Sequence, residues 1–306
     1  THKNHPTFIS RLLIQRMTTS NPSPRYVKAV ATAFKEGAHG GVTYSGVYGD
    51  LGATFAAILL DSEARSLTLD ADPTHGMLRE PLLKVYAVLR SLEWATGQGQ
   101  FSQLMSLEKT IGQEHFMSPT VFNFYDPTYQ PEGPVVDTGL VAPEAQISNG
   151  PHLVGLLNWL ATALRTWTSN GIVHFTPAVD VTDSSGVVHE LDLLLTAGRL
   201  NSRSRSHIVS RYSEKLEQEG ASEALRYAQE LFTFTSEFHT TNLHEPRYDV
   251  SRAFRPPTSS QGRPYKALVY LFLNGGADSW NLLVPHSGCV RPALEPQYDL
   301  YEQYAA

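Results

Sequence analysis

An aspartate, Asp278, follows two glycines at the end of an apolar run, in the stretch LFLNGGADSWNLLVP at 271–285. In open α/β sheets, ligands bind beyond the carboxyl ends of the strands, and Gly275 and Gly276 would let the chain turn sharply there. A carboxylate at such a place is a natural ligand for a hard or borderline cation. The same residues also fit a glycine-rich turn in which Asp278 caps the following segment. Both interpretations stay open from the residues alone.

A second group of side chains suited to binding is the aromatic segment SPTVFNFYDPTYQPEGPV at 118–135. Its rings are those of Phe122, Phe124, Tyr125 and Tyr129. Aromatic side chains offer wide and rigid contact area, which suits a sugar ring or a proline-rich partner. The alternative, which we favour, is a long loop that its own rings anchor to a helical core.

The other candidate site residues are better explained by structural roles. Arg79 and Glu80 precede Pro81, and an acidic residue at a helix start is stabilised by the helix dipole. The 12 histidines include no His-Glu-x-x-His pattern, and His239 and His244 are five residues apart, which places them on different faces of a helix. We therefore expect scattered histidines rather than a metal cluster.

The composition excludes several classes of protein. With 306 residues, 41% hydrophobic and 18% charged, the chain can bury a substantial core. A net charge of −6 argues against nucleic acid as the partner. The single cysteine, Cys289, excludes an internal disulfide. No apolar stretch reaches the roughly 20 residues that cross a bilayer, and neither a Gly-x-Ser-x-Gly elbow nor a phosphate-binding glycine loop occurs.

Helical periodicity dominates the chain up to about residue 245. A first helix begins near Pro6, with Ile9, Leu12, Leu13 and Met17 on one face. Residues 38–49 are rich in glycine and predict a loop. A second expected helix begins at Pro24 after a Ser23 cap and stops at Gly37, a short third helix follows Asp50 as its cap, and a fourth begins at Pro81. Further helices are expected at 151–168, 204–218 and 221–235.

The domain prediction has three parts. Residues 1–245 are expected to form a mainly α-helical domain with a long aromatic and proline-rich loop, incomplete at its N-terminus. The start without an initiator Met fits the middle of a longer polypeptide or a processed product. Residues 246–265, rich in Pro, Arg and Ser, form a linker. Residues 266–306 begin with KALVYLFL, a continuous apolar run typical of a buried parallel strand, and form the start of a truncated α/β domain.

Four stretches resemble one known family. They are HPTFISRLLIQRMTTSNPSP, LREPLLKVYAVLRSL, SPTVFNFYDPTYQPEGPV with GLVAPEAQI, and LDLLLTAGRL with TFTSEF. Their order within residues 3–243 is similar to that in the C-terminal half of the domain-of-unknown-function 1800 family.

Residues 265–288 resemble the N-terminal strand of a second family, domain of unknown function 1501, which is similar to the alkaline phosphatase and sulfatase superfamily. In that superfamily an Asp just after the first strand is a metal ligand, and Asp278 is the matching position. The resemblance implies an exported protein and a divalent metal in an intact parent. The remaining ligands and the nucleophile of that superfamily come from later in the chain.

The predicted function is that of a helical accessory or binding module of an exported protein, fused to an incomplete hydrolase-like domain and not catalytic by itself. One alternative is a metal-dependent phosphate or sulfate ester hydrolase in the intact parent. Another is a glycan-binding module that uses the aromatic loop. The expected partners are the remainder of the sulfatase-like domain or an extracellular polysaccharide, with no nucleic acid and no transmembrane segment.

Overall fold

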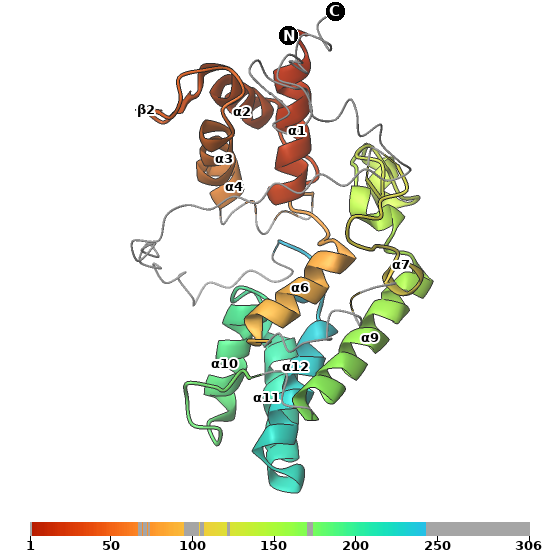
Figure 1. The fold of residues 1–306 in the computed structure, drawn as a ribbon. Helices are drawn as coiled ribbons and strands as arrows, with labels where there is room; N and C mark the ends of the chain where they lie inside the picture. Colours follow the sequence, from red (N-terminus) through yellow and green to blue (C-terminus); the bar gives the residue numbers. More distant parts are fainter. Residues whose placement is uncertain are drawn as a thin grey trace, which may run out of the picture. The chain divides into compact units, whose positions relative to one another are not determined.

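The computed structural model describes residues 2–66, 69, 72, 74–94, 104, 107–120, 123–169 and 174–242 (Figure 1). These residues are mainly helical, as the sequence predicts, and their strands form one short antiparallel pair. The predicted linker at 246–265 and the predicted strand after it lie outside the described residues. The domain boundaries therefore stay predictions.

The first four helices surround a small apolar core. It is built from side chains of the first three of them, which contact one another. The helices are α1 (His5–Met17), α2 (Pro24–Glu36), α3 (Leu51–Leu60) and α4 (Ser62–Arg65). The buried apolar residues are Ile14, Tyr26, Val30, Ala33, Ala53, Ala57 and Ile58.

Two predicted caps fix where these helices begin. The Ser23 hydroxyl accepts a hydrogen bond from the Tyr26 N–H at 3.2 Å, and the Asp50 carboxylate accepts one from the Ala53 N–H at 2.9 Å. Such caps stabilise a helix by about 1 kcal/mol. α2 ends as predicted at Gly37, whose φ of 61° is the left-handed conformation that glycine adopts without strain.

α1 confirms the predicted helix, and Leu13 of its predicted apolar face packs against the core, but burial extends to residues outside that face. Met17 is 41% exposed, whereas Ser10, Ile14 and Gln15 are buried. The reason is a polar contact that apolar periodicity does not register. The Gln15 side-chain amide donates to the backbone carbonyl of Ser20 at 3.0 Å and to that of Pro127 at 3.1 Å.

The glycine-rich stretch after α2 contains the strand pair. β1 (Ala38–His39) and β2 (Val42–Thr43) are antiparallel, and the turn between them is Gly40-Gly41. Both glycines have positive φ, 58° and 80°, as a tight two-residue hairpin requires. The predicted loop is thus corrected to a short hairpin followed by irregular chain.

A larger core lies among the later helices. α11 packs along α12, which also contacts α9 and α10 (Figure 1). The predicted helices at 151–168, 204–218 and 221–235 are confirmed as α9, α11 and α12, while α10 was not predicted. The elements are α6 (Pro81–Ser91), α7 (Glu108–Ile111), α9 (Gly150–Ser169), α10 (Ser184–Leu195), α11 (Ser202–Glu219), α12 (Ala221–Thr233) and α13 (Ser236–His239).

The segment between α7 and α9 docks on the α1–α2 connection. It contains α8 (Pro134–Asp137) and the 3-10 helix η2 (Pro143–Gln146). The Asn21 side-chain amide donates to the Val141 carbonyl at 2.9 Å and accepts from the Val141 N–H at 2.9 Å. This pairing satisfies backbone groups that a loop would otherwise leave to water.

The last described residues return to the segment before α6. The Arg79 N–H donates to the His239 carbonyl at 2.9 Å, and the Thr241 N–H donates to that of Met77 at 3.1 Å. The Arg199 guanidinium donates at 2.8–2.9 Å to three carbonyls in the same stretch, those of Glu237, Thr240 and Asn242.

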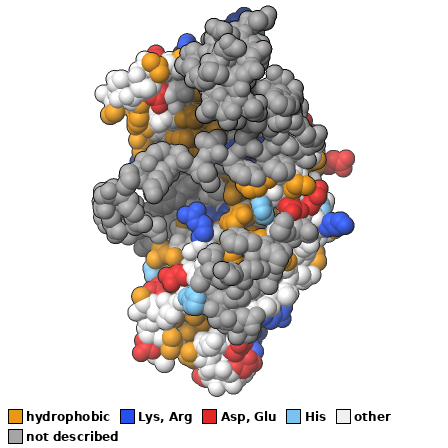
Figure 2. All heavy atoms as spheres, viewed as in Figure 1, with side chains coloured by type: hydrophobic (Ala, Val, Ile, Leu, Met, Phe, Trp, Pro, Cys, Tyr) orange, Lys and Arg blue, Asp and Glu red, His pale blue; other side chains and the backbone are white. Residues whose placement is uncertain are grey.

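On the face shown in Figure 2, acidic and basic side chains are interspersed over the described surface. Within the described residues, no helix is both long and apolar enough to cross a membrane.

Candidate functional site

Five polar side chains of the described residues are joined by hydrogen bonds and ion pairs, and we call this group the Arg16 cluster. Arg16 comes from α1, Glu80 from the start of α6, Glu144 from η2, and Gln113 and Tyr125 from irregular chain. Tyr125 donates to Glu80 at 2.6 Å and accepts a short hydrogen bond from Arg16, whose guanidinium also lies 4.3 Å from the tyrosine ring centre. Gln113 donates to Glu80 at 2.5 Å.

Two carboxylates share the Arg16 charge in this cluster. The guanidinium lies 3.5 Å from a Glu144 oxygen and 4.0 Å from a Glu80 oxygen. Glu144 is fully buried, and its Oε2 has no hydrogen-bond partner among the described residues. Burial raises the pKa of Glu144 to about 7, because desolvation penalises the charged carboxylate more than nearby Arg16 favours it.

Further ionisable groups with shifted pKa values lie next to the cluster. Lys84 is 2% exposed, and burial, together with the charge of Arg79, lowers its pKa to about 8. Burial and the charges of Lys84 and Arg79 lower the pKa of His239 to about 4. Perturbed pKa values gather at functional sites, but structural ion-pair networks produce them too. The cluster is largely buried, with Arg16 partly exposed, and its hydrogen bonds and ion pairs join α1 to η2 and to the residue preceding α6.

The Arg79–Glu80 pair is structural, but not in the way a helix start suggests. Glu80 is the residue preceding α6, yet its side chain makes no capping hydrogen bond and joins the Arg16 cluster instead. Arg79 donates to the Phe238 carbonyl at 2.8 Å and lies over the Phe238 ring. Burial lowers the pKa of Arg79 to about 10, and the nearby charge of Arg199 adds to this.

The structure places the predicted aromatic residues in different surroundings. Tyr125 is 3% exposed and held in the Arg16 cluster, while Phe124 and Tyr129 are partly buried. Phe122 and the predicted metal ligand Asp278 lie outside the described residues. A ligand-binding role for the four rings and a metal role for Asp278 stay predictions.

Within the described residues, no group of three or more His, Cys, Asp or Glu side chains is placed to hold a metal ion.

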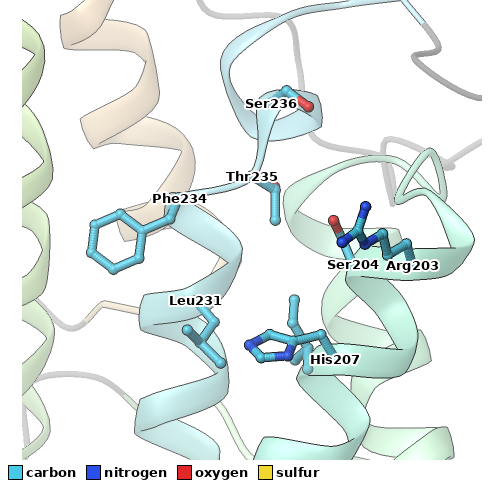
Figure 3. Close-up of a pocket in the computed structure, with 8 residues that line it drawn as sticks. Arg203, Ser204, His207, Leu231, Phe234, Thr235 and Ser236 are labelled. Carbon is cyan, nitrogen blue, oxygen red and sulfur yellow. The ribbon is translucent and has the colours of Figure 1, made fainter.

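An open pocket of about 640 Å³ lies between α11 and α12 (Figure 3). Arg203 and His207 reach it from successive turns of α11, and Leu231 and Phe234 come from the end of α12. Neither the Arg203 nor the His207 side chain has a hydrogen bond or ion pair with another described residue. Phe234 lies at the edge of the pocket and is 47% exposed, and its ring is directed to the other side of α12, away from Arg203 and His207 (Figure 3).

Hydroxyl groups complete the lining of this pocket. Ser204 accepts a hydrogen bond from the Asn201 amide at 3.0 Å, which leaves its own proton free to be donated. Thr235 precedes α13 and Ser236 is its first residue (Figure 3). No acidic residue is among the lining side chains, so the pocket offers donors and apolar surface rather than paired carboxylates.

Sequence reasoning missed this pocket, although a signal exists. Arg203 lies just before the helix predicted at 204–218, and His207 lies within it, four residues later, which places both on one face of α11. No acidic residue stands at helical spacing to pair with them.

The fold and these sites define a helical module with a largely buried polar cluster and an open pocket. The chain belongs to the family described as protein of unknown function (DUF1800), whose model matches residues 1–250. This confirms the family of the first resemblance drawn from the sequence, while the assignment to its C-terminal half stays a prediction. No curated protein and no solved structure matches the chain.

Proposed function

We propose that the helical part of this chain is a non-catalytic binding module of an exported protein, and that its ligand site is the pocket between α11 and α12. One observation carries the proposal. The Arg203 and His207 side chains are unpaired within the described residues, and the pocket that they line extends to the exposed Phe234 at the end of α12. Binding sites typically combine apolar surface with a few polar groups that fix the ligand's orientation.

The proposed ligand is an oligosaccharide. A sugar offers an apolar ring face to an aromatic side chain and a rim of hydroxyls to hydrogen-bonding groups. Arg203 and His207 supply nitrogen donors and Ser204 supplies a hydroxyl, while the Phe234 ring, directed to the other side of α12, supplies an aromatic surface for a further sugar unit of the chain. This moves the predicted glycan site away from Tyr125, whose ring is covered in the fold.

Calorimetric titration of the chain with a panel of acidic and neutral oligosaccharides tests the proposal. We expect Phe234→Ala to weaken binding about tenfold, in line with the cost of losing an exposed aromatic contact. Phe8→Ala is the matched control, since Phe8 is also exposed but lines no described pocket, and it should leave the affinity unchanged.

Two outcomes would overturn the pocket as the site. One is binding that Phe234→Ala and His207→Ala leave intact. The other is binding that is lost in Phe124→Ala and Tyr129→Ala instead, which would return the site to the aromatic loop. Circular dichroism of each variant separates lost binding from lost fold.

A second candidate function concerns the intact parent. We propose that it hydrolyses phosphate or sulfate esters with a divalent metal held partly by Asp278. The stretch LFLNGGADSW and its resemblance to the domain-of-unknown-function 1501 family support this. Asp278 would supply one carboxylate ligand, and the metal would polarise the ester.

Expression of the full reading frame tests this second proposal. Metal analysis should find a divalent ion that Asp278→Asn depletes, and cell fractionation should find the protein outside the cytoplasm. A metal-free, cytoplasmic parent without esterase activity would contradict it.

A further inference from the structure

The first 35 residues contain six basic side chains and no acidic one, although the whole chain carries a net charge of −6. Two of the six are paired with carboxylates. Arg16 pairs with Glu144, and Arg25 pairs with Asp61 at 2.6 Å and with Glu63 at 3.3 Å. Four cations of this segment remain.

These four side chains line one groove, of about 600 Å³, between α1 and α2. All four are exposed, and none has a hydrogen bond or an ion pair with another described residue. No acidic residue lines the groove; Glu36, the first acid of the sequence, is not part of it. The four cations are Lys3, Arg11, Lys28 and Lys35.

The spacing of the charges follows from the helices that carry them. Lys28 and Lys35 are seven residues apart on α2, hence on one face and about 10 Å apart along the axis. Thr7 and Arg11 are one turn apart on α1. A complementary ligand therefore carries at least two negative groups separated by about 10 Å.

The other residues that line the groove indicate which class of polyanion fits it. The floor between the charges is aliphatic, with Pro6, Val27 and Ala31, and two hydroxyls come from Thr7 and Thr32. No aromatic ring lines the groove. Single-stranded nucleic acids and sugars gain much of their affinity from stacking on rings, so this groove suits them poorly.

An extended peptide fits better. In polyproline II conformation, residues three apart lie on one side at about 9 Å, which matches the separation of the lysines. Its aliphatic groups would contact the floor, and its backbone would be within reach of threonine hydroxyls.

We propose that the groove between α1 and α2 binds an acidic, extended peptide segment of a partner protein. The site is separate from the pocket between α11 and α12, so failure of one proposal leaves the other standing.

Fluorescence anisotropy with a labelled peptide of Glu-Pro-Ala repeats tests this on the full 306-residue chain. We expect binding at low ionic strength that weakens as salt rises, because exposed charges are screened. The double variant Lys28→Glu/Lys35→Glu should reduce affinity about tenfold or more. The control Arg90→Glu/Lys109→Glu makes the same change in net charge at exposed positions outside the groove, and should change affinity less than about twofold.

Two further variants keep the outcome decisive should the charge reversal disturb folding. Lys28→Gln/Lys35→Gln retains most of each side chain and should also lose affinity, whereas Thr32→Arg adds a cation and should raise it. The proposal is overturned by absent peptide binding at low salt, or by peptide binding equally reduced in the control. It is also overturned if only dextran sulfate or oligothymidylate binds with this sensitivity, since the groove would then serve another class of polyanion.

Discussion

α1 places two arginines in opposite situations. Arg16 points into the Arg16 cluster, where two carboxylates and a tyrosine surround it, while Arg11, five residues earlier, lines the open groove with no described partner. A charge removed from water must be paired to be tolerated, but a charge left in water is free to meet a ligand. The comparison separates a region that holds the fold together from one available for binding.

The largest expected effect comes from a substitution that breaks the Arg16 cluster. Arg16→Met leaves the buried Glu144 and the partly buried Glu80 without their counter-charge, so the free energy of unfolding should fall by about 3 kcal/mol, near the lower end for buried pairs because Arg16 is partly exposed. Urea denaturation measures this. Arg11→Met on the same helix should change stability by less than about 0.5 kcal/mol. Equal losses in the two variants would contradict the distinction.

A pH experiment sharpens the comparison at Lys84. Its pKa is about 8 in the folded chain and near its ordinary 10.5 when unfolded. Between these values the unfolded chain binds a proton that the folded chain does not, so the contribution of Lys84 to stability rises with pH from about 8 to 10.5.

Lys84→Met should remove this rise and should be more stable than the parent at pH 7, by about 2 kcal/mol, because a buried charge is replaced by an apolar chain. Denaturation curves at pH 7, 8, 9 and 10 give both quantities. Lys109→Met, at an exposed position, serves as control, and an unchanged pH profile in Lys84→Met would refute the assignment.

The smallest expected effect separates two tyrosines of the aromatic segment. Tyr125→Phe removes the hydroxyl that donates to Glu80 and accepts from Arg16, and should cost about 1.5 kcal/mol of stability. The Tyr129 hydroxyl has no hydrogen bond to another described residue, so Tyr129→Phe should be nearly neutral. Thermal unfolding of the two variants measures both losses. A larger loss of stability in Tyr129→Phe than in Tyr125→Phe would show that Tyr125 is not part of the Arg16 cluster.

Local signals predicted much of the helical framework. Ser23, Gly37 and Asp50 act through hydrogen bonds or backbone conformations within a few residues, and such local features can be recognised in a single sequence. α10 was also within reach. Asp183 caps it by accepting from the Gly186 N–H at 2.9 Å, and Val187, Leu191 and Leu195 recur at helical spacing.

The long-range chemistry could not be predicted in the same way. Gln15 turns inward because of a carbonyl 112 residues away, and Tyr125 meets a carboxylate 45 residues back in the chain. Apolar periodicity assigns such polar residues to the surface. The overall charge of −6 likewise concealed an acid-free segment at 1–35, because net charge averages over positions that the fold keeps apart.

The contact between Arg199 and the carbonyls of 237, 240 and 242 has a practical consequence for cutting the chain. A fragment that stops after Asn242 keeps every partner of that guanidinium named above. One that stops at Thr235 removes those carbonyls, uncovers the surface beneath Phe238, and leaves two arginines, 79 and 199, without the acceptors that α13 and the residues after it provide. The shortest well-behaved fragment should therefore extend seven residues beyond Thr235, as far as Asn242, although those residues add little helix.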